Sequence, residues 1–391
     1  MKHRLMRITT VPISLLVLLK KQLVFMADHF DVIAVSSGGN ILRQVETETA
    51  VRVGEINMTR KVTPLQDLIG VFKLIRLMCR ERPTIVHTHT PKAGLLGMIA
   101  AKIACVPIRL HTVAGLPILE KKGVLRWVMG CTEKLTSACA TQVYPNSANM
   151  MQLMIEKGYC TRDKGKVIGQ GSTSGIDTHH FDAQLPEILE LKKHTRSALG
   201  LKAESFVYCF IGRIVGDKGI SELVTAFCDL YEKNSNVILL MVGPFETDLD
   251  PLSDRIRSVI AQHDAIRWLD FQSDIRIYLA ISDVFVFPSY REGFPNVVMQ
   301  AGAMGLPCIV SDINGCNEII EHEVNGLIIP VKNVPALYQA MEILLINTSK
   351  RLAIVAVCRR MIQDRFESDR LMELLLSEYY QLIDNNKIKN P

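Results

Sequence analysis

Two residues of one turn, Glu292 and Gly293, have the types and the setting of a ligand site. The apolar run 284–287 predicts a buried strand before this turn, and Pro295 predicts that a helix begins after it, because a missing N–H costs nothing there. The first amides of that helix would favour a phosphate. Glu292 could then bind sugar hydroxyls, and Gln300, about two helical turns further on, could reach a ribose. A strand–turn–helix without a ligand is the alternative.

Two cations, Arg213 and Lys218, follow the apolar run 206–212, which also predicts a strand. An arginine can bind a diphosphate through two parallel hydrogen bonds, and a lysine supplies a point charge. Because both stand at a strand end in an otherwise acidic part of the chain, we predict that they bind a diphosphate. Solvated surface cations are the alternative.

His87 and His89 are spaced so that both side chains of a strand would point the same way. Such a pair suggests a metal site, but a zinc site needs further ligands, and none follows at a suitable spacing. We therefore expect no metal and no other cofactor.

Short β-rich runs alternate with helical stretches along the chain, which predicts parallel sheets covered on both faces. Helical periodicity marks 65–80, 220–233 and 368–383. Strands are expected in two series, at 5–9, 32–36, 85–90, 108–113, 142–147 and 166–171, and then at 206–212, 237–243, 266–271, 284–289, 307–312 and 326–330.

This order predicts an α/β protein with two doubly wound, Rossmann-like domains that face a cleft. The charged stretch 186–204 separates the two series. We expect an N-terminal domain over 1–185, a C-terminal domain over 186–367, and a last helix over 368–391 that packs back towards the N-terminal domain. In such sheets ligands bind outside the carboxyl ends of the strands.

The net charge of +5 conceals an uneven distribution. Residues 1–170 carry 24 Lys and Arg against 11 Asp and Glu, a net +13, whereas the remainder carries 21 against 29, a net −8. A basic front half predicts an anionic partner for that half. Cations that could face an anionic membrane are Lys20, Lys21, Arg60, Lys61, Lys73, Arg76, Lys121, Lys122 and Arg126. Solvated helix faces are the alternative.

The composition also indicates a compartment. The 10 cysteines are scattered without a CxxC pair, which is typical of reduced, buried thiols in the cytoplasm. The apolar run 11–19 ends at Lys20 and Lys21, too short to span a bilayer, and we expect an amphipathic helix there. Few aromatic residues and no recognition helix argue against nucleic-acid binding.

In order and spacing, these motifs resemble glycosyltransferase family 4, whose members have the GT-B fold, use nucleotide sugars and retain the anomeric configuration. The GR…KG motif of that family is matched by Gly212-Arg213 and Lys218-Gly219, and its EGF…E motif by 292–294 with position 300. The resemblance implies catalytic roles for Glu292, Arg213 and Lys218. It implies donor contacts from Gly212, Gly293, Phe294, Pro295, Asn296, Val297 and Gln300.

The front half resembles a narrower group, the transferases of capsular polysaccharide and other surface glycans. The resemblance rests on 86–97 and 109–117, which relatives use near the acceptor. It implies acceptor-side roles for Lys92, which could contact a phosphate, and for His111 at a strand end.

The chain departs from the family pattern at three places. Gln300 replaces a glutamate, and its amide can still bond ribose hydroxyls without charge assistance. Ala114 stands where many relatives have a histidine. The usual glycine-rich first loop is replaced by 9–12, where Thr9 and Thr10 offer hydroxyls instead, and we place Thr10 on the acceptor side of the site.

Together these features lead us to expect a retaining transferase that moves a sugar from a UDP-linked nucleotide sugar to a lipid-diphosphate-linked saccharide. It would work in the cytoplasm, at an anionic membrane surface on the inner face of the plasma membrane. A nucleotide-sugar epimerase of the same fold and a non-catalytic nucleotide-sugar-binding subunit are the alternatives.

Overall fold

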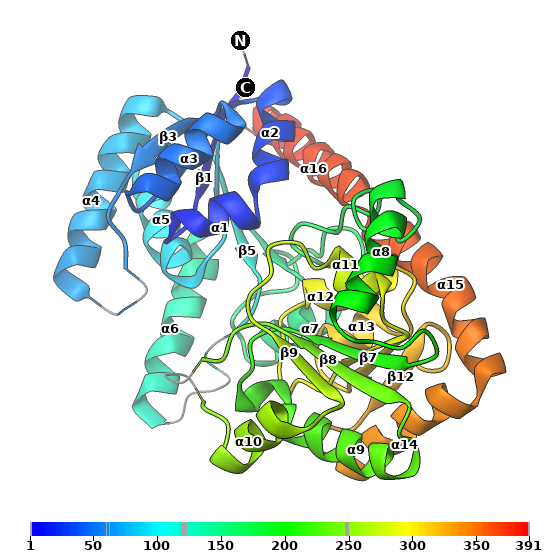
Figure 1. The fold of residues 1–391 in the computed structure, drawn as a ribbon. Coiled ribbons are helices and arrows are strands. Elements are labelled where there is room, and N and C mark those ends of the chain that lie inside the picture. Colours follow the sequence, from blue (N-terminus) through cyan, green and yellow to red (C-terminus); the bar gives the residue numbers. More distant parts are fainter. Residues whose placement is uncertain are drawn as a thin grey trace. The chain divides into compact units, whose positions relative to one another are not determined.

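The structure is a computed structural model that describes residues 2–59, 61, 63–116, 118, 123–246 and 250–389. It divides into two compact units (Figure 1). The first unit is Met1–Gly175 with Ser368–Pro391, and the second is Ile176–Glu367. The second unit thus begins before the expected boundary at 186, because Ile176 forms a bridge with Glu367 and packs into the second unit's core.

The first unit contains one parallel sheet in the order β3-β2-β1-β4-β5-β6. This is the strand order of a Rossmann fold. Alternate residues of β1 enter two separate cores, Met6 and Ile8 on one face and Leu5 on the other, so the sheet is covered on both sides. The strands are β1 Arg4–Ile8, β2 Asp31–Ser36, β3 Arg52–Glu55, β4 Ile85–Thr88, β5 Ile108–Val113 and β6 Gln142–Pro145.

Helices surround this sheet (Figure 1). The helix expected at 11–19 is the short helix α1, which ends at Val17, and a separate helix, α2, begins directly after that range at Lys20. The last helix, α16, packs on α2 and β5 within the first unit. The helices are α1 Pro12–Val17, α2 Lys20–His29, α3 Asn40–Thr49, α4 Pro64–Glu81, α5 Pro91–Ile103, α6 Gly123–Cys139, α7 Ala148–Glu156 and α16 Ser368–Lys389.

In the first unit, one predicted strand is absent and one strand was missed. The segment 166–171 is irregular, because its glycines Gly169 and Gly171 take φ values of 59° and 117°, and only Gly165 before it forms an isolated bridge with Val143. The edge strand β3 was missed, because its sequence is short and polar, as suits an edge.

The second unit repeats the architecture with its own parallel sheet, in the order β12-β11-β10-β7-β8-β9. Read from the other edge, this is again the Rossmann order, and all six predicted strands are present. The α/β fold with two doubly wound sheets is therefore confirmed. The strands are β7 Phe206–Ile211, β8 Val237–Val242, β9 Ile266–Leu269, β10 Val284–Phe287, β11 Cys308–Ser311 and β12 Gly326–Ile329.

The helices of the second unit include α9, which covers the predicted 220–233 because residues at helical spacing, such as Leu223 and Phe227, are fully buried. The charged stretch expected between the domains forms α8 instead. The helices are α8 Pro186–Ala198, the short 3₁₀ helix η2 Gly216–Lys218, α9 Ile220–Lys233, α10 Asp254–Gln262, α11 Arg276–Ala280, α12 Asn296–Ala303, α13 Cys316–Ile319, α14 Val334–Ile346 and α15 Thr348–Phe366.

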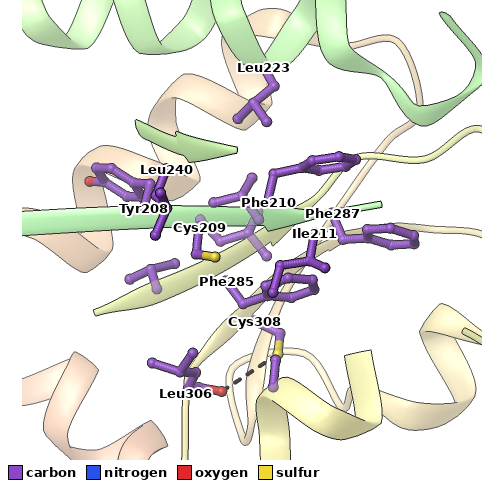
Figure 2. Close-up of a cluster of buried hydrophobic side chains, with 14 of the residues drawn as sticks. Tyr208, Cys209, Phe210, Ile211, Leu223, Leu240, Phe285, Phe287, Leu306 and Cys308 are labelled. Atoms are coloured by element: carbon purple, nitrogen blue, oxygen red, sulfur yellow. Dashed lines mark hydrogen bonds between the residues drawn. The ribbon is translucent and has the colours of Figure 1, made fainter. Parts of the chain in front are cut away.

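The core of the second unit fixes the strands that carry the predicted site (Figure 2). Phe210 of β7 stacks on Phe287 of β10, with ring centroids 5.9 Å apart, and Phe285 stacks on Phe287 at 6.0 Å. Each of these three phenylalanines is at most 2% exposed. Because β7 and β10 also pair directly, their carboxyl ends are held side by side.

The cysteine prediction holds for part of the set. Cys139, Cys160, Cys209, Cys308, Cys316 and Cys358 are buried, Cys228 is half-buried, and Cys79, Cys105 and Cys131 are exposed. All are free thiols.

Candidate functional site

The loop after β7 carries Arg213 and Lys218, and it is pressed against the end of β10. Gly219 has φ 69°, and a Cβ at this position would overlap the carbonyl oxygen of Pro288. Only glycine fits both requirements. The strands β7 and β10 are also where the order of the sheet reverses, which is the point where open α/β sheets bind ligands.

The loop after β10 leads into α12. Pro295 is the N-cap of this helix, with φ −75°, and Asn296 is its first residue, one position later than expected. Among the described residues, no side chain caps this helix. Its first amides therefore remain available to a ligand.

Glu292 forms an ion pair with Lys218, which brings together two of the three predicted catalytic residues. Ser289 donates a hydrogen bond from Oγ to Oε1 of Glu292 over 3.2 Å. The Lys218 and Glu292 side chains are 12% and 18% exposed, so the pair lies largely away from water. Lys218 Nζ also lies 5.8 Å from the centroid of the Phe287 ring.

Arg213 pairs with a residue that the sequence did not single out. Its Nη1 lies 2.7 Å from Oε2 of Glu246, and both side chains are about half-buried. The hydrogen bond to Glu246 raises the pKa of Arg213, which therefore stays charged. A neighbouring pair joins Arg291 to Asp217 at 2.8 Å.

The turn at Gly293 is supported from the loop after β11. Asn314 donates from Nδ2 to the carbonyl oxygen of Gly293 over 3.1 Å. Gly315 has φ 78°, and its missing side chain leaves room for the backbone of Gly293 and Phe294. The ring of Phe294 packs edge-on against Phe366, with centroids 5.4 Å apart. The sequence points to Asn314 and Ser289 as site residues only through their position at predicted strand ends.

The remaining donor-side predictions lie on α12 or at its start. Val297 and Gln300 are half-buried, and Asn296 is exposed. The Gln300 side chain makes no hydrogen bond to the other described residues, Glu292 included. Gly212 directly follows β7.

The acceptor-side predictions fall in the first unit, and the structure gives each one a protein partner. Thr10 follows β1, and its hydroxyl lies 2.7 Å from that of Thr90 and accepts a hydrogen bond from the amide of Ala93. These two contacts hold Thr10 against the start of α5. The β1–β4 junction beside it is the reversal point of this sheet.

Lys92 forms an ion pair with Asp67, with Nζ 2.7 Å from Oδ1. Their side chains are only 13% and 19% exposed, and Thr63 Oγ1 accepts a second hydrogen bond from Lys92. A phosphate at this lysine would therefore have to compete with a nearby carboxylate.

His111 lies beneath α5 and is only 2% exposed. Its Nδ1 lies 2.8 Å from Thr88 Oγ1, and a Cβ on Gly94 would overlap its ring. Burial lowers its pKa to about 4. Because His111 is covered by α5, an acceptor cannot reach it in this arrangement.

His87 and His89 point the same way, as expected, with ring centroids 4.2 Å apart. Within the described ranges, no three His, Cys, Asp or Glu side chains are grouped as a metal site would require. In the same part of the chain, no helix has the length and apolar character needed to cross a bilayer.

Two family models match the chain. The model described as glycosyl transferases group 1 matches residues 192–360, and the model described as glycosyl transferase 4-like matches residues 14–147. The first contains the loops of Arg213 and Glu292, and the second contains those of Lys92 and His111.

Curated relatives and solved structures agree with these models. The capsular polysaccharide biosynthesis glycosyltransferase CapM of Staphylococcus aureus is 33% identical over 92% of both chains. An α-1,3-galactosyltransferase of Escherichia coli that acts on GlcNAc-diphosphoundecaprenol is 29% identical over 84% of this chain and 83% of its own. HepE of Anabaena, solved with UDP, superposes with a TM-score of 0.80 at 19% identity, over 97% of this chain and 100% of its own. The extent of the match to CapM shows that this chain is a glycosyltransferase and belongs to family 4, the GT-B family that its motifs predicted.

Proposed function

We propose that this enzyme transfers a sugar from a UDP-sugar to a lipid-diphosphate-linked saccharide, with retention, during the synthesis of a surface polysaccharide. The observation that carries the proposal is the grouping of Arg213, Lys218 and Glu292 at the paired carboxyl ends of β7 and β10. Two cations and a carboxylate beside a free helix start suit a sugar diphosphate better than a neutral ligand.

Each of these groups has a role in the proposed reaction. Arg213 and Lys218 neutralise the charge that builds on the leaving diphosphate, and the start of α12 adds its dipole. Glu292 holds hydroxyls of the donor sugar. No step needs a metal ion, because the two cations supply the positive charge.

The relatives support the donor and the acceptor. HepE was solved with UDP, and the relatives from Escherichia coli and Campylobacter jejuni are named for acceptors linked to diphosphoundecaprenol. A panel of UDP- and GDP-sugars, scored by the rise in melting temperature, tests the donor, since a bound ligand stabilises the fold. A rise with GDP-sugars alone would contradict the UDP assignment.

Transfer and stereochemistry need a second experiment. The UDP-sugar that stabilises the protein is incubated with GlcNAc-diphosphoundecaprenol, and the anomeric coupling constant of the product is read by NMR. We expect an anomeric configuration equal to that of the donor. Conversion of the donor sugar without acceptor would instead indicate an epimerase, and donor binding without any turnover would indicate a silent binding subunit.

We further propose that the first unit lies on the anionic inner face of the plasma membrane. On α4, Leu65, Leu68 and Phe72 are exposed at helical spacing, with Lys73 and Arg76 beside them. An apolar stripe edged by cations is typical of helices that lie in a membrane interface.

A second exposed apolar surface occurs at the start of α6, which like α4 packs on α5. Val124 and Trp127 are exposed there, next to Arg126. Of the other predicted cations, Lys20 and Lys21 pair with Glu48 and Asp369, Lys61 is exposed, and Arg60, Lys121 and Lys122 lie outside the described residues.

Flotation with liposomes tests this surface. We expect binding to vesicles that contain phosphatidylglycerol, and weaker binding for Phe72→Ser and for Lys73→Glu. The matched control is Phe271→Ser, which changes an exposed phenylalanine of the second unit. Binding that does not depend on anionic lipid would contradict the proposal.

A further inference from the structure

Ser289 lies in the turn that carries Glu292. It is the second residue after β10, and its side chain is fully buried. Its hydroxyl oxygen lies 3.1 Å from the carbonyl oxygen of Arg291, 3.3 Å from that of Asp217 and 3.2 Å from Oε1 of Glu292. One hydroxyl therefore reaches the loop after β7, the loop after β10 and the carboxylate that β10 presents to a ligand.

The hydroxyl has one proton to direct at these three acceptors. The carboxylate of Glu292 is the charged acceptor, and hydrogen bonds to charged groups are about twice as strong as those between neutral groups. The carbonyl oxygen of Asp217 already accepts from the amide of Tyr290 over 2.8 Å. The proton of Ser289 is therefore directed at Glu292.

The two oxygens of the Glu292 carboxylate have different surroundings. Oε1 accepts hydrogen bonds from Lys218 Nζ and from Ser289 Oγ. Oε2 makes no hydrogen bond to the other described residues. Because each carboxylate oxygen can accept about two hydrogen bonds, Oε1 is saturated by the protein and Oε2 is left for the hydroxyls of a ligand.

The two groups that anchor Oε1 are not equivalent once a donor binds. In the proposed reaction Lys218 also neutralises the leaving diphosphate, so it has to share its three N–H groups between the carboxylate and a phosphate. The hydroxyl of Ser289 has no second task of this kind, because its side chain is fully buried and out of reach of a phosphate. Ser289 is thus the anchor for which a diphosphate does not compete.

We propose that Ser289 is a positioning residue, which holds Oε1 of Glu292 so that Oε2 faces the hydroxyls of the transferred sugar. Ser289 does not touch the sugar and acts only through Glu292. Without its hydroxyl the carboxylate can turn about its side-chain torsions, and small displacements of a catalytic group lower the rate strongly. This inference rests on the proposed function, because that function assigns the sugar hydroxyls to Glu292.

A double-mutant cycle tests this role, since two residues that act as a unit have non-additive effects. With the UDP-sugar that stabilises the protein and GlcNAc-diphosphoundecaprenol, we expect Ser289→Ala to lower kcat about tenfold, while the KM for the acceptor stays within about twofold. In the Glu292→Gln background, Ser289→Ala should lower kcat by less than about twofold. An unchanged kcat in Ser289→Ala, or a loss of about tenfold in both backgrounds, would overturn the inference.

Ser311→Ala is the matched control. Ser311 ends β11, which pairs with β10, and it is fully buried like Ser289. Its hydroxyl, however, has no hydrogen-bond partner within the described structure. The same atom is thus removed from a similar strand end, and kcat should stay within about twofold of the wild-type value. An equal loss in Ser311→Ala and Ser289→Ala would assign both losses to packing and contradict the positioning role.

Binding provides a test that needs no turnover. UDP, UDP-glucose, UDP-galactose and UDP-GlcNAc are titrated into the wild type and into Ser289→Ala by calorimetry. For the UDP-sugar that the wild type binds most tightly, we expect the dissociation constant to rise about threefold in Ser289→Ala. The dissociation constant for UDP should stay within about 1.5-fold, because UDP lacks the sugar. Equal changes for UDP and the UDP-sugar would contradict an action through Glu292.

The two proposals can fail separately. Absence of binding by every UDP-sugar would refute the proposed function, and this inference with it. Binding and transfer that Ser289→Ala leaves unchanged would refute the positioning role alone. If Ser289→Ala does not fold, as judged by its melting temperature, Ser289→Cys takes its place, because it keeps a weak donor at the same position. Its kcat should fall about threefold, and a wild-type kcat would overturn the inference.

Discussion

The ammonium of Lys218 pairs with the carboxylate of Glu292 across 74 residues of chain. The first comes from the loop after β7 and the second from the loop after β10, and the two strands are neighbours in the sheet. A cation suited to a leaving phosphate and a carboxylate suited to sugar hydroxyls are thus held against each other before any donor binds. Little reorganisation of this pair is needed when the donor arrives.

Glu292→Gln should lower kcat about 100-fold or more, because the amide cannot provide the charge that orients and stabilises the reacting sugar. The dissociation constant for UDP should stay within about threefold of the wild-type value, since UDP lacks the sugar that Glu292 would contact. Glu323→Gln, which changes an exposed glutamate paired with Lys350, is the control and should behave as wild type. Unchanged kcat in Glu292→Gln would remove this residue from the catalytic group.

Glu246→Gln should tighten the binding of UDP. Glu246 occupies Arg213, and a diphosphate has to displace it. Partly exposed pairs of this kind contribute about 0.2–1 kcal/mol, so the dissociation constant should fall about 1.4- to fivefold. Isothermal titration calorimetry can measure this change, with Asp254→Asn, which breaks the exposed pair to Arg257, as the control. Weaker binding would mean that Glu246 orients Arg213 for the donor instead.

Gln300→Glu should also strengthen nucleotide binding. A carboxylate accepts hydrogen bonds from ribose hydroxyls more strongly than an amide, by about 1 kcal/mol. We expect the dissociation constant for UDP to fall about fivefold in Gln300→Glu. In Gln300→Ala the same constant should rise. If Gln300→Ala binds UDP as wild type does, this side chain does not contact the ribose.

The first unit should lose stability in acid. A histidine of the unfolded chain takes up its proton near pH 6.5, whereas buried His111 does so only near pH 4. Below pH 6.5 the unfolded state binds more protons, so the free energy of unfolding falls as the pH drops from 6.5 towards 4. The loss from His111 should be about 1–3 kcal/mol. Urea denaturation between pH 4.5 and 8 measures it.

His111→Gln should flatten this pH dependence, since glutamine does not titrate. His179→Gln, which changes an exposed histidine of the second unit, should leave it unaltered. An equally steep fall in His111→Gln would assign the effect to other groups, such as His87 and His89, whose pKa values burial also lowers.

The sequence predicted the fold well wherever strands are central and apolar. Strands such as β7 and β10 are buried on both faces and appear as continuous apolar runs. The edge strand β3 has no such run. The segment 166–171 contains an apolar pair, Val167 and Ile168, but the left-handed glycines beside it prevent a strand.

The candidate site was predictable as a set of strand-end residues but not as a set of contacts. Arg213 and Glu292 follow recognisable strands, whereas the adjacency of β7 and β10 depends on strand order, which periodicity does not determine. The partner of Arg213, Glu246, has no motif of its own. The burial of His111 likewise depends on which face of β5 the helix α5 covers.

The bridge between Ile176 and Glu367 closes the second unit at both of its ends. In chain order, the second unit is therefore an insert within the first, whose own sequence resumes at Ser368. A domain whose two ends lie close together can be removed or exchanged, because the flanking chain can then be rejoined across a short distance. One continuous stretch of gene therefore encodes the whole second unit, whereas removal of the last helix would damage the first unit.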